Sequence, residues 1–208
     1  MATVDDRRTT AVGASRKKSR PSGPRHWRWT AEQYRRLDEL GFFEDHHVEL
    51  IDGAIIELTT NPPHNTAVDL SCTALRAAWG PGYVVREEKT LDLGRRYQPR
   101  PDAAVLIGNT RDFAAKPPST AVLVVEVADT SLRHDRVVKA HRYALAGIAD
   151  YWIVNLIDRQ VEVYRNPGPD PDRPGRHCYA EVSIVPVDGH VTPLAKTDVQ
   201  IAVADLLP

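Results

Sequence analysis

The sequence predicts an α/β protein in which a central mixed β-sheet is flanked by helices. The first observation is a short apolar run at residues 121–127, AVLVVEV, which is typical of a strand buried on both faces. The second is an Asp-Gly pair inside the apolar stretch at residues 48–58, which indicates a β-hairpin. The third is helical spacing of apolar residues before and after the central run. Helices that alternate with strands and hairpins predict a mixed sheet with covered faces.

The N-terminal third is expected to contain two helices, one on each side of the hairpin. Thr30 is a favourable N-cap and Gln33 completes a capping box, so a helix is expected to begin there and to end at Gly41. The hairpin turns at Asp52-Gly53. After a Pro-Pro pair that interrupts the chain, residues 64–79 show helical periodicity and predict the second helix.

The remaining chain is expected to alternate strands with one long helix. The predicted elements are strands at residues 83–93, 102–107 and 121–127, a loop at 109–120, a helix at 132–146, a hairpin of 151–156 with 161–164, a loop at 166–176, a strand at 178–187 and a packing tail at 199–207. The helix is expected to cover the sheet with its apolar face, which consists of Val137, Val138, His141, Ala144 and Leu145.

Length and charge divide the chain into one domain and a basic leader. The 208 residues suit a single domain, expected at residues 27–208, whereas residues 1–26 are polar, lack periodicity and are expected to be disordered. Residues 1–29 hold eight Arg or Lys and two Asp, so an overall charge of −1 leaves −7 for the rest of the chain. This acidic domain differs from proteins that coat DNA. The leader either supplies the attraction to phosphate or is only solvated.

The sequence carries no signal for a membrane or for secretion. No apolar stretch approaches the ~20 residues that span a bilayer, and the N-terminus lacks an apolar signal region. Cys72 and Cys178 lack metal-ligand spacing and are expected to be free thiols in a reducing compartment. A cytoplasmic protein without a membrane partner is therefore predicted. The G-x-S-x-G hydrolase motif and the glycine motifs of nucleotide-binding proteins are absent from the sequence.

Two acidic residues lie where apolar strands are expected. Glu126 shares a strand face with Val122 and Val124, and a buried carboxylate without a partner costs several kcal/mol. Asp102 follows Pro101 at the start of another apolar strand. Carboxylates on adjacent strands can share one Mg²⁺ or Mn²⁺ ion. The plainer interpretations are an Asp that begins a strand at a turn and a Glu that reaches a neighbouring basic residue.

Four further residues are candidates for the same site. Lys139 lies on the polar side of its helix, where it could stabilise charge on a phosphate or be exposed to solvent. Asp135, one turn earlier, could orient it. Glu49, in the first hairpin strand, is either a third acid at the metal or an outward-facing residue. His64 follows the Pro-Pro pair and could contact phosphate or bind a metal, or it could be a capping or a surface residue.

These residues occur within sequence blocks that resemble a known family. The stretch LVVEVADTSLRHDRVVKAHRYALAGIADYWIVNLIDRQVEVYRNP is similar to the core of the Uma-two-type restriction endonucleases, which belong to the PD-(D/E)XK nuclease superfamily. The blocks VELIDGAIIEL, Pro-Pro-His64, Pro101-Asp102 and IAVADLLP resemble the same family in the same order. The resemblance covers roughly residues 27–208 and leaves out the basic leader.

The resemblance implies a restriction-endonuclease-like fold and assigns roles to the candidate residues. Asp102 and Glu126 would be the paired acids that bind the metal, and Glu49 the additional acid. The superfamily lysine usually stands two residues after the Glu, where this chain has Ala128. Lys139 resembles a lysine that has migrated to the following helix. The predicted substrate contacts are His64, which matches a family position, and Arg142, which shares the polar helix side with Lys139.

The predicted function is a metal-dependent endonuclease that hydrolyses phosphodiester bonds of nucleic acid, with DNA as the expected substrate and Mg²⁺ or Mn²⁺ as the cofactor. One alternative is a non-catalytic module that uses a nuclease fold to bind nucleic acid or protein. Another is a phosphohydrolase for small substrates, which a closed pocket rather than an open groove would favour. Many proteins with this fold dimerise, so this chain is also expected to be able to form a homodimer.

Overall fold

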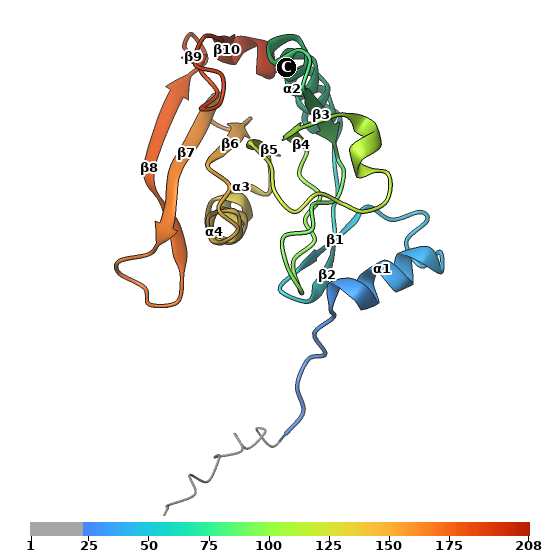
Figure 1. Ribbon diagram of the computed structural model, residues 1–208. Coiled ribbons are helices and arrows are strands. Elements are labelled where there is room, and N and C mark those ends of the chain that lie inside the picture. The colour runs from blue at the N-terminus through green and yellow to red at the C-terminus, as the bar shows by residue number, and fades with distance from the viewer. Residues whose placement is uncertain (1–22) are drawn as a thin grey trace, which may run out of the picture.

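A six-stranded mixed β-sheet forms the centre of the fold (Figure 1). The computed structural model describes residues 23–208, so most of the predicted leader at residues 1–26 lies outside the described residues. The strands lie in the order of the chain: β3 (Tyr83–Glu87), β4 (Ala103–Ile107), β5 (Leu123–Ala128), β6 (Asp150–Asn155), β7 (Gln160–Pro169) and β8 (His177–Pro186). Only β5 and β6 pair in parallel, while the other neighbours are antiparallel. The predicted α/β class with a mixed sheet is confirmed.

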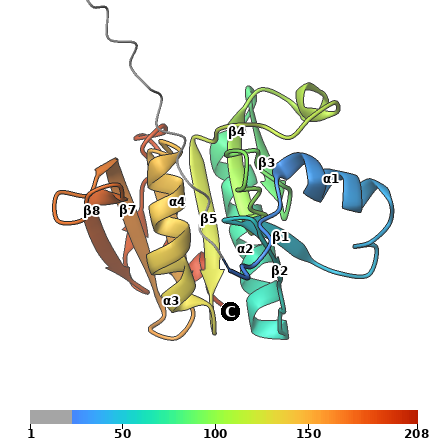
Figure 2. The ribbon, with the colours of Figure 1, turned by 90° about the horizontal axis from the view of Figure 1, so that it is seen from below.

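Helices cover both faces of this sheet (Figures 1 and 2). On one face, α2 (Pro62–Trp79) packs through Cys72 and Leu75 against the sheet. On the other face lies one continuous helical segment that connects β5 to β6. It consists of α3 (Leu132–His134), a π-helical turn η2 (Asp135–Lys139) and α4 (Ala140–Leu145). The crossover that joins the two parallel strands therefore carries the helix in which Lys139 lies.

The N-terminal elements form a separate unit beside the α4 face. Helix α1 (Ala31–Glu39) begins at the predicted capping box, in which the Gln33 amide donates to Thr30 Oγ1 over 3.3 Å. Strands β1 (Val48–Ile51) and β2 (Ala54–Glu57) form the predicted hairpin. Its turn residues have positive φ, and a Cβ on Gly53 would lie 2.9 Å from the Trp29 carbonyl oxygen. Tyr34 ties helix to hairpin by donating to the Val48 carbonyl over 2.8 Å.

The C-terminal tail packs on the domain, as predicted, and the structure places it on the α2 side of the sheet. Strands β9 (His190–Val191) and β10 (Ile201–Ala202) form a short antiparallel pair, and the 3₁₀ turn η3 (Val203–Leu206) follows. The side chains of Ile201, Val203 and Leu206 are buried in the same core as α2. No helix within residues 23–208 has the length and apolar character needed to span a bilayer.

Two predicted strand boundaries and one loop differ in the structure. The strand expected at residues 83–93 ends at Glu87, because Glu88 has a φ of 45° and breaks the extended conformation. The loop expected at residues 166–176 is shorter, because β7 continues to Pro169 and pairs there with β8. Cross-strand pairing outweighs the loop-forming composition of this Pro- and Gly-rich segment. The 3₁₀ turn η1 (Thr110–Phe113) lies inside the predicted loop at residues 109–120.

The predicted orientation of the helix after β5 is correct for Val138 and Ala144, which pack in the core, and wrong for two other residues. Val137 and Leu145, which were expected to face the sheet, are each 46% exposed. Besides the predicted Ala144, the buried residues of this segment are Asp135, Lys139, Ala140 and Tyr143. The sheet surface beneath them is filled by the rings of Tyr151, Tyr164 and Tyr179. Small alanines fit against these rings, so the bulkier Val137 and Leu145 are left outside.

The two thiols are expected to differ in reactivity. Cys72 is fully buried, and burial raises the pKa of its thiol to about 12, whereas Cys178 is partly exposed. We therefore expect iodoacetamide at pH 8 to modify Cys178 in the native protein and to leave Cys72 unmodified. Mass spectrometry of the digested protein measures this, with the denatured protein as the control in which both react. Equal labelling of both cysteines in the native protein would contradict the burial of Cys72.

Candidate active site

The topology of the sheet brings the two predicted acids together. Because β4 runs antiparallel to β5, the beginning of β4 lies beside the end of β5, and Ala103 pairs with Val125. Asp102 immediately precedes β4, and Glu126 lies near the end of β5. Both carboxylates therefore lie at the edge of the sheet where β5 ends, a usual place for ligands in open α/β sheets.

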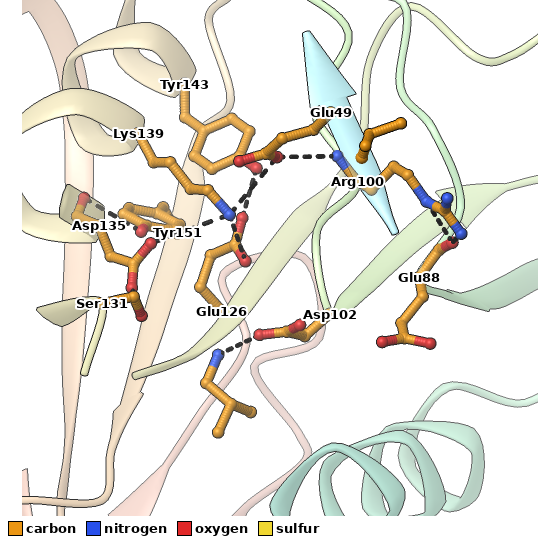
Figure 3. A network of polar contacts seen from close by, with 12 residues as sticks. Glu49, Glu88, Arg100, Asp102, Glu126, Ser131, Asp135, Lys139, Tyr143 and Tyr151 are labelled. Atoms are coloured by element: carbon orange, nitrogen blue, oxygen red, sulfur yellow. Dashed lines mark hydrogen bonds and ion pairs between the residues drawn. The ribbon is translucent and has the colours of Figure 1, made fainter. Parts of the chain in front are cut away.

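Asp102 is held by the backbone of the neighbouring strand. Its Oδ2 accepts a hydrogen bond from the Val127 amide over 2.6 Å, and the residue is 8% exposed (Figure 3). His64, from the start of α2, brings Nε2 to 3.4 Å from Asp102 Oδ1. This distance permits an ion pair, but the two groups are not aligned for a hydrogen bond, and His64 Nε2 is buried without a hydrogen-bond partner.

Glu126 faces the helix that follows its strand, as the alternation of β5 predicts. It shares the sheet face of Val124 and Ala128, and only 2% of it is exposed. Tyr143 donates to Glu126 Oε1 over 2.6 Å, while Lys139 Nζ lies 3.0 Å from Oε2. Figure 3 shows Glu126 between Lys139 and Asp102. The carboxylate that looked misplaced in an apolar strand is thus fully partnered by one helix.

Lys139 is buried, and its ammonium group lies among three carboxylates. Its Nζ lies 3.7 Å from Glu49 Oε2 and 3.9 Å from Asp135 Oδ1, in addition to the contact with Glu126. The solvent-exposed alternative for Lys139 is therefore wrong, since the residue is 5% exposed. The predicted i, i+4 relation to Asp135 is present in the structure, and Ser131 fixes Asp135 by donating to its Oδ2 over 2.6 Å.

A π-helical turn carries both Asp135 and Lys139. The Ala140 amide donates to the Asp135 carbonyl, which is an i to i+5 hydrogen bond. The same carbonyl also accepts from the Tyr151 hydroxyl over 3.3 Å. Such turns occur mostly as single insertions in α-helices and frequently at functional sites. Here the turn places the side chains of both residues on the face toward Glu126.

Glu49 joins the cluster from the separate hairpin. The alternating strand pattern left it either inward or outward, and the structure buries it completely in β1. Its Oε2 accepts from the Arg100 amide over 3.2 Å. Its Oε1 is buried and has no hydrogen-bond partner among residues 23–208. The hairpin is held in place by mutual backbone hydrogen bonds of 3.1 and 2.8 Å between Leu50 and Gln98.

The pKa values in the cluster reflect an excess of buried acids over bases. Burial raises the pKa of Glu126 well above its usual value, and Asp102, Asp135 and Glu49 add to this rise while Lys139 opposes it. Burial also raises the pKa of Asp135. For Lys139, burial alone would lower the pKa, but the surrounding carboxylates outweigh it and raise the pKa well above its usual value. The ammonium therefore stays charged, and the site attracts further positive charge.

The cluster lines a cavity of about 220 Å³. The side chains on its wall include Glu49, Asp102, Glu126, Asp135, Lys139, His64 and His134. Sequence reasoning missed His134, whose Nε2 is buried and lacks a hydrogen-bond partner, and Tyr143. Tyr143 lies four residues after Lys139, so the helical spacing from Lys139 could have indicated it. Arg142, the other predicted substrate contact, is not on this wall. It pairs with Asp52 and lies over the ring of Tyr97.

The ligand atoms around the cavity suit a hard divalent cation. Glu49, Asp102 and Glu126 offer carboxylate oxygens, which Mg²⁺ and Mn²⁺ prefer, and the unpartnered Glu49 Oε1 is a ready acceptor. In the described part of the chain, no three His, Cys, Asp or Glu side chains converge on one point as a metal-ligand group. The donor set thus fits the metal chemically, and Lys139 offsets only part of its negative charge.

Comparisons with known proteins agree with this architecture. A family model described as "Uma2: Putative restriction endonuclease" matches residues 31–194, so the closing segment IAVADLLP lies outside the match. A crystal structure described as that of a putative nuclease belonging to DUF820, from Anabaena variabilis, is similar with a TM-score of 0.59 and 17% sequence identity. The similarity covers 82% of this chain and 96% of that chain. It confirms the restriction-endonuclease-like fold. A search of curated proteins found no match.

Proposed function

The chain belongs to the Uma2 family of restriction-endonuclease-type nucleases, and on this premise we propose that it is a divalent-metal-dependent endonuclease acting on DNA. The observation that carries the proposal is the buried cluster itself. Carboxylates from adjacent strands and a lysine from the following helix line one cavity, although the lysine position on the strand is occupied by Ala128. A buried cluster with more acids than bases is costly for folding, so its presence indicates a functional site.

In this proposal Glu49, Asp102 and Glu126 hold the metal ion. A bound Mg²⁺ or Mn²⁺ supplies a water of lowered pKa and neutralises charge on the phosphate. Asp102 is oriented by the Val127 amide and Glu126 by the Tyr143 hydroxyl, so both carboxylates keep a defined direction. Preorganised ligands of this kind avoid the cost of reorganising the site during the reaction.

Lys139 and two histidines act on the substrate in this proposal. The raised pKa of Lys139 keeps it protonated, so its ammonium can stabilise negative charge that develops on the phosphoryl oxygens. His64 and His134 face the cavity with Nε2 atoms that have no hydrogen-bond partner among residues 23–208, and each can donate to a phosphate oxygen. These donors give an otherwise acidic cavity its affinity for a phosphodiester.

The function is tested by incubating plasmid DNA with the protein in Mg²⁺, Mn²⁺ or EDTA. We expect cleavage with either metal and none in EDTA. We expect the cleavage rate of Asp102→Asn to be at least about 100-fold lower than that of the parent, since a single group that stabilises transition-state charge contributes on this scale. Asn keeps an oxygen for the Val127 amide, so the fold is retained. Cleavage by Asp102→Asn at the parent rate would place the activity elsewhere, and cleavage of RNA instead of DNA would change the substrate assignment.

A second function, hydrolysis of a small phosphate ester, is favoured by the small size of the cavity. The acids line a cavity of about 220 Å³, which is small for a double helix and large enough for one phosphate ester group. Parallel assays with bis(p-nitrophenyl) phosphate and a DNA oligonucleotide distinguish the two functions. If the parent hydrolyses only the small ester, and Glu126→Gln loses that hydrolysis, the second function is favoured.

A further inference from the structure

A second buried acid lies in the same row of the sheet as Glu126. Glu126 pairs with Ile153 on β6, and Ile153 pairs with Glu162 on β7. Residues paired in this way point to the same face of a sheet, so both acids face the helical segment between β5 and β6. Glu162 is 2% exposed, yet it lies outside the wall of the catalytic cavity.

Glu162 binds the π-helical turn through Arg136. Arg136 Nε and one terminal nitrogen donate to the two carboxylate oxygens over 2.9 and 2.5 Å, in a bidentate arrangement. Asn155 Nδ2 and the Tyr164 hydroxyl each donate a further hydrogen bond of 2.8 Å. Paired bonds from a charged guanidinium to a carboxylate are directional and about twice as strong as neutral ones. The carboxylate is therefore fully satisfied and has a fixed position.

The same helical turn is thus attached to the sheet at two points of one row. Arg136 binds Glu162, and Lys139, three residues later, binds Glu126. Both residues belong to the turn Asp135–Lys139, whose i to i+5 hydrogen bond departs from a regular α-helix. Such a departure costs hydrogen-bond geometry, so contacts outside the helix must stabilise it.

We propose that Glu162 is a positioning residue for the active site, holding the π-helical turn through Arg136 so that Lys139 points into the acid cluster. Glu162 touches none of the proposed reacting groups, and its effect passes through the backbone of the turn. The kinetic part of the proposal rests on the proposed nuclease function, whereas the placement of Lys139 does not.

A matched control is present in the same sheet. Asp150 at the opposite end of β6 is also fully buried and accepts from Arg165 Nε over 3.0 Å and from Trp152 Nε1 over 2.9 Å. None of its hydrogen bonds or ion pairs reaches the π-helical turn. Asp150→Asn therefore removes a buried carboxylate of the same kind without releasing the turn, and it reports what lost stability alone does.

The direct test is the rate at which an amine reagent acetylates Lys139, followed by mass spectrometry. We expect Glu162→Gln to raise this rate about tenfold, the change expected when one hydrogen bond to a charged group no longer holds the turn closed. Arg136→Met should give the same increase, and the double variant should add little, because both substitutions break one contact. Asp150→Asn should lower the Tm and leave the Lys139 rate at the parent value.

The kinetic test compares kcat and KM on a DNA oligonucleotide. We expect Glu162→Gln to lower kcat about tenfold with KM within twofold of the parent, because a displaced Lys139 weakens the transition state more than substrate binding. A parent rate of Lys139 acetylation in Glu162→Gln, with a lowered Tm, would overturn the proposal and leave Glu162 a purely structural residue. If the parent cuts no nucleic acid, the proposed function fails, and the acetylation rates still decide the placement of Lys139.

Discussion

Glu126→Gln is expected to abolish nucleic-acid cleavage and to raise the Tm of the protein. Burial and neighbouring acids raise the pKa of Glu126, so the ionised carboxylate opposes folding at neutral pH. A raised pKa for an acid means that stability falls as the pH rises from the ordinary value for Glu toward the raised one. Gln keeps the shape and an oxygen for Tyr143 but carries no charge. Residues that serve catalysis often lower the stability of the folded protein in this way.

We expect Glu126→Gln to raise the free energy of unfolding by about 1 kcal/mol, which for a domain of this size corresponds to a Tm higher by about 2–4 °C. Thermal unfolding at pH 5 and pH 8 measures it, and the difference from the parent should be larger at pH 8. The control is Glu181→Gln, which removes an exposed acid from β8 and should change neither cleavage nor the pH dependence. A Tm below that of the parent at pH 8 would show that Glu126 stabilises the fold through Lys139.

Lys139→Met is expected to destabilise the protein by about 3–5 kcal/mol, the usual cost of leaving buried charges without their partner. Lys139 is the cation that lies among Glu49, Glu126 and Asp135. Because its pKa is raised, the stability it contributes is present below the ordinary pKa of Lys and is lost as the pH rises through the raised value. Cleavage should also be lost, because no other ammonium faces the cavity among its described wall residues.

Urea unfolding of Lys139→Met and of the exposed control Lys116→Met measures this prediction. The difference in unfolding free energy between the parent and Lys139→Met should shrink as the pH falls toward 5, because Glu126 and Asp135 take up protons more readily than ordinary acids. Added Mg²⁺ should stabilise Lys139→Met more than the parent, since the cation offsets the same carboxylates. Equal stability of Lys139→Met and Lys116→Met would contradict the burial of the ammonium.

The pairing of Asp102 with Glu126 was predictable because both residues lie at the ends of recognisable apolar strands. Local signals of this kind include Pro101 before the first acid and the valines that alternate with the second. Once the two strands are neighbours and antiparallel, the positions of the acids follow from strand geometry. The capping box at Thr30 and the turn at Asp52-Gly53 were predictable for the same reason, since each depends on a few consecutive residues.

The orientation of the helix after β5 was not predictable from its own residues. Its apolar side chains indicated one face, but the tyrosines of the sheet accept Ala140 and Ala144 and leave Val137 exposed. Which face of a helix is buried depends on the shape of the surface it meets, and that surface comes from distant strands. The helical pattern alone therefore left Lys139 either at the site or exposed to solvent, whereas the structure places it against Glu126.

The sequence by itself therefore determined the mixed sheet, the hairpins and the two acids at one sheet edge, because these depend on short-range patterns and on strand alternation. Only the tertiary structure decided the burial of Lys139, the arrival of Glu49 from a separate hairpin and the attachment of the π-helical turn to Glu162. Each of these joins residues far apart in the chain, and their energies depend on burial and on distances that arise only when the elements pack.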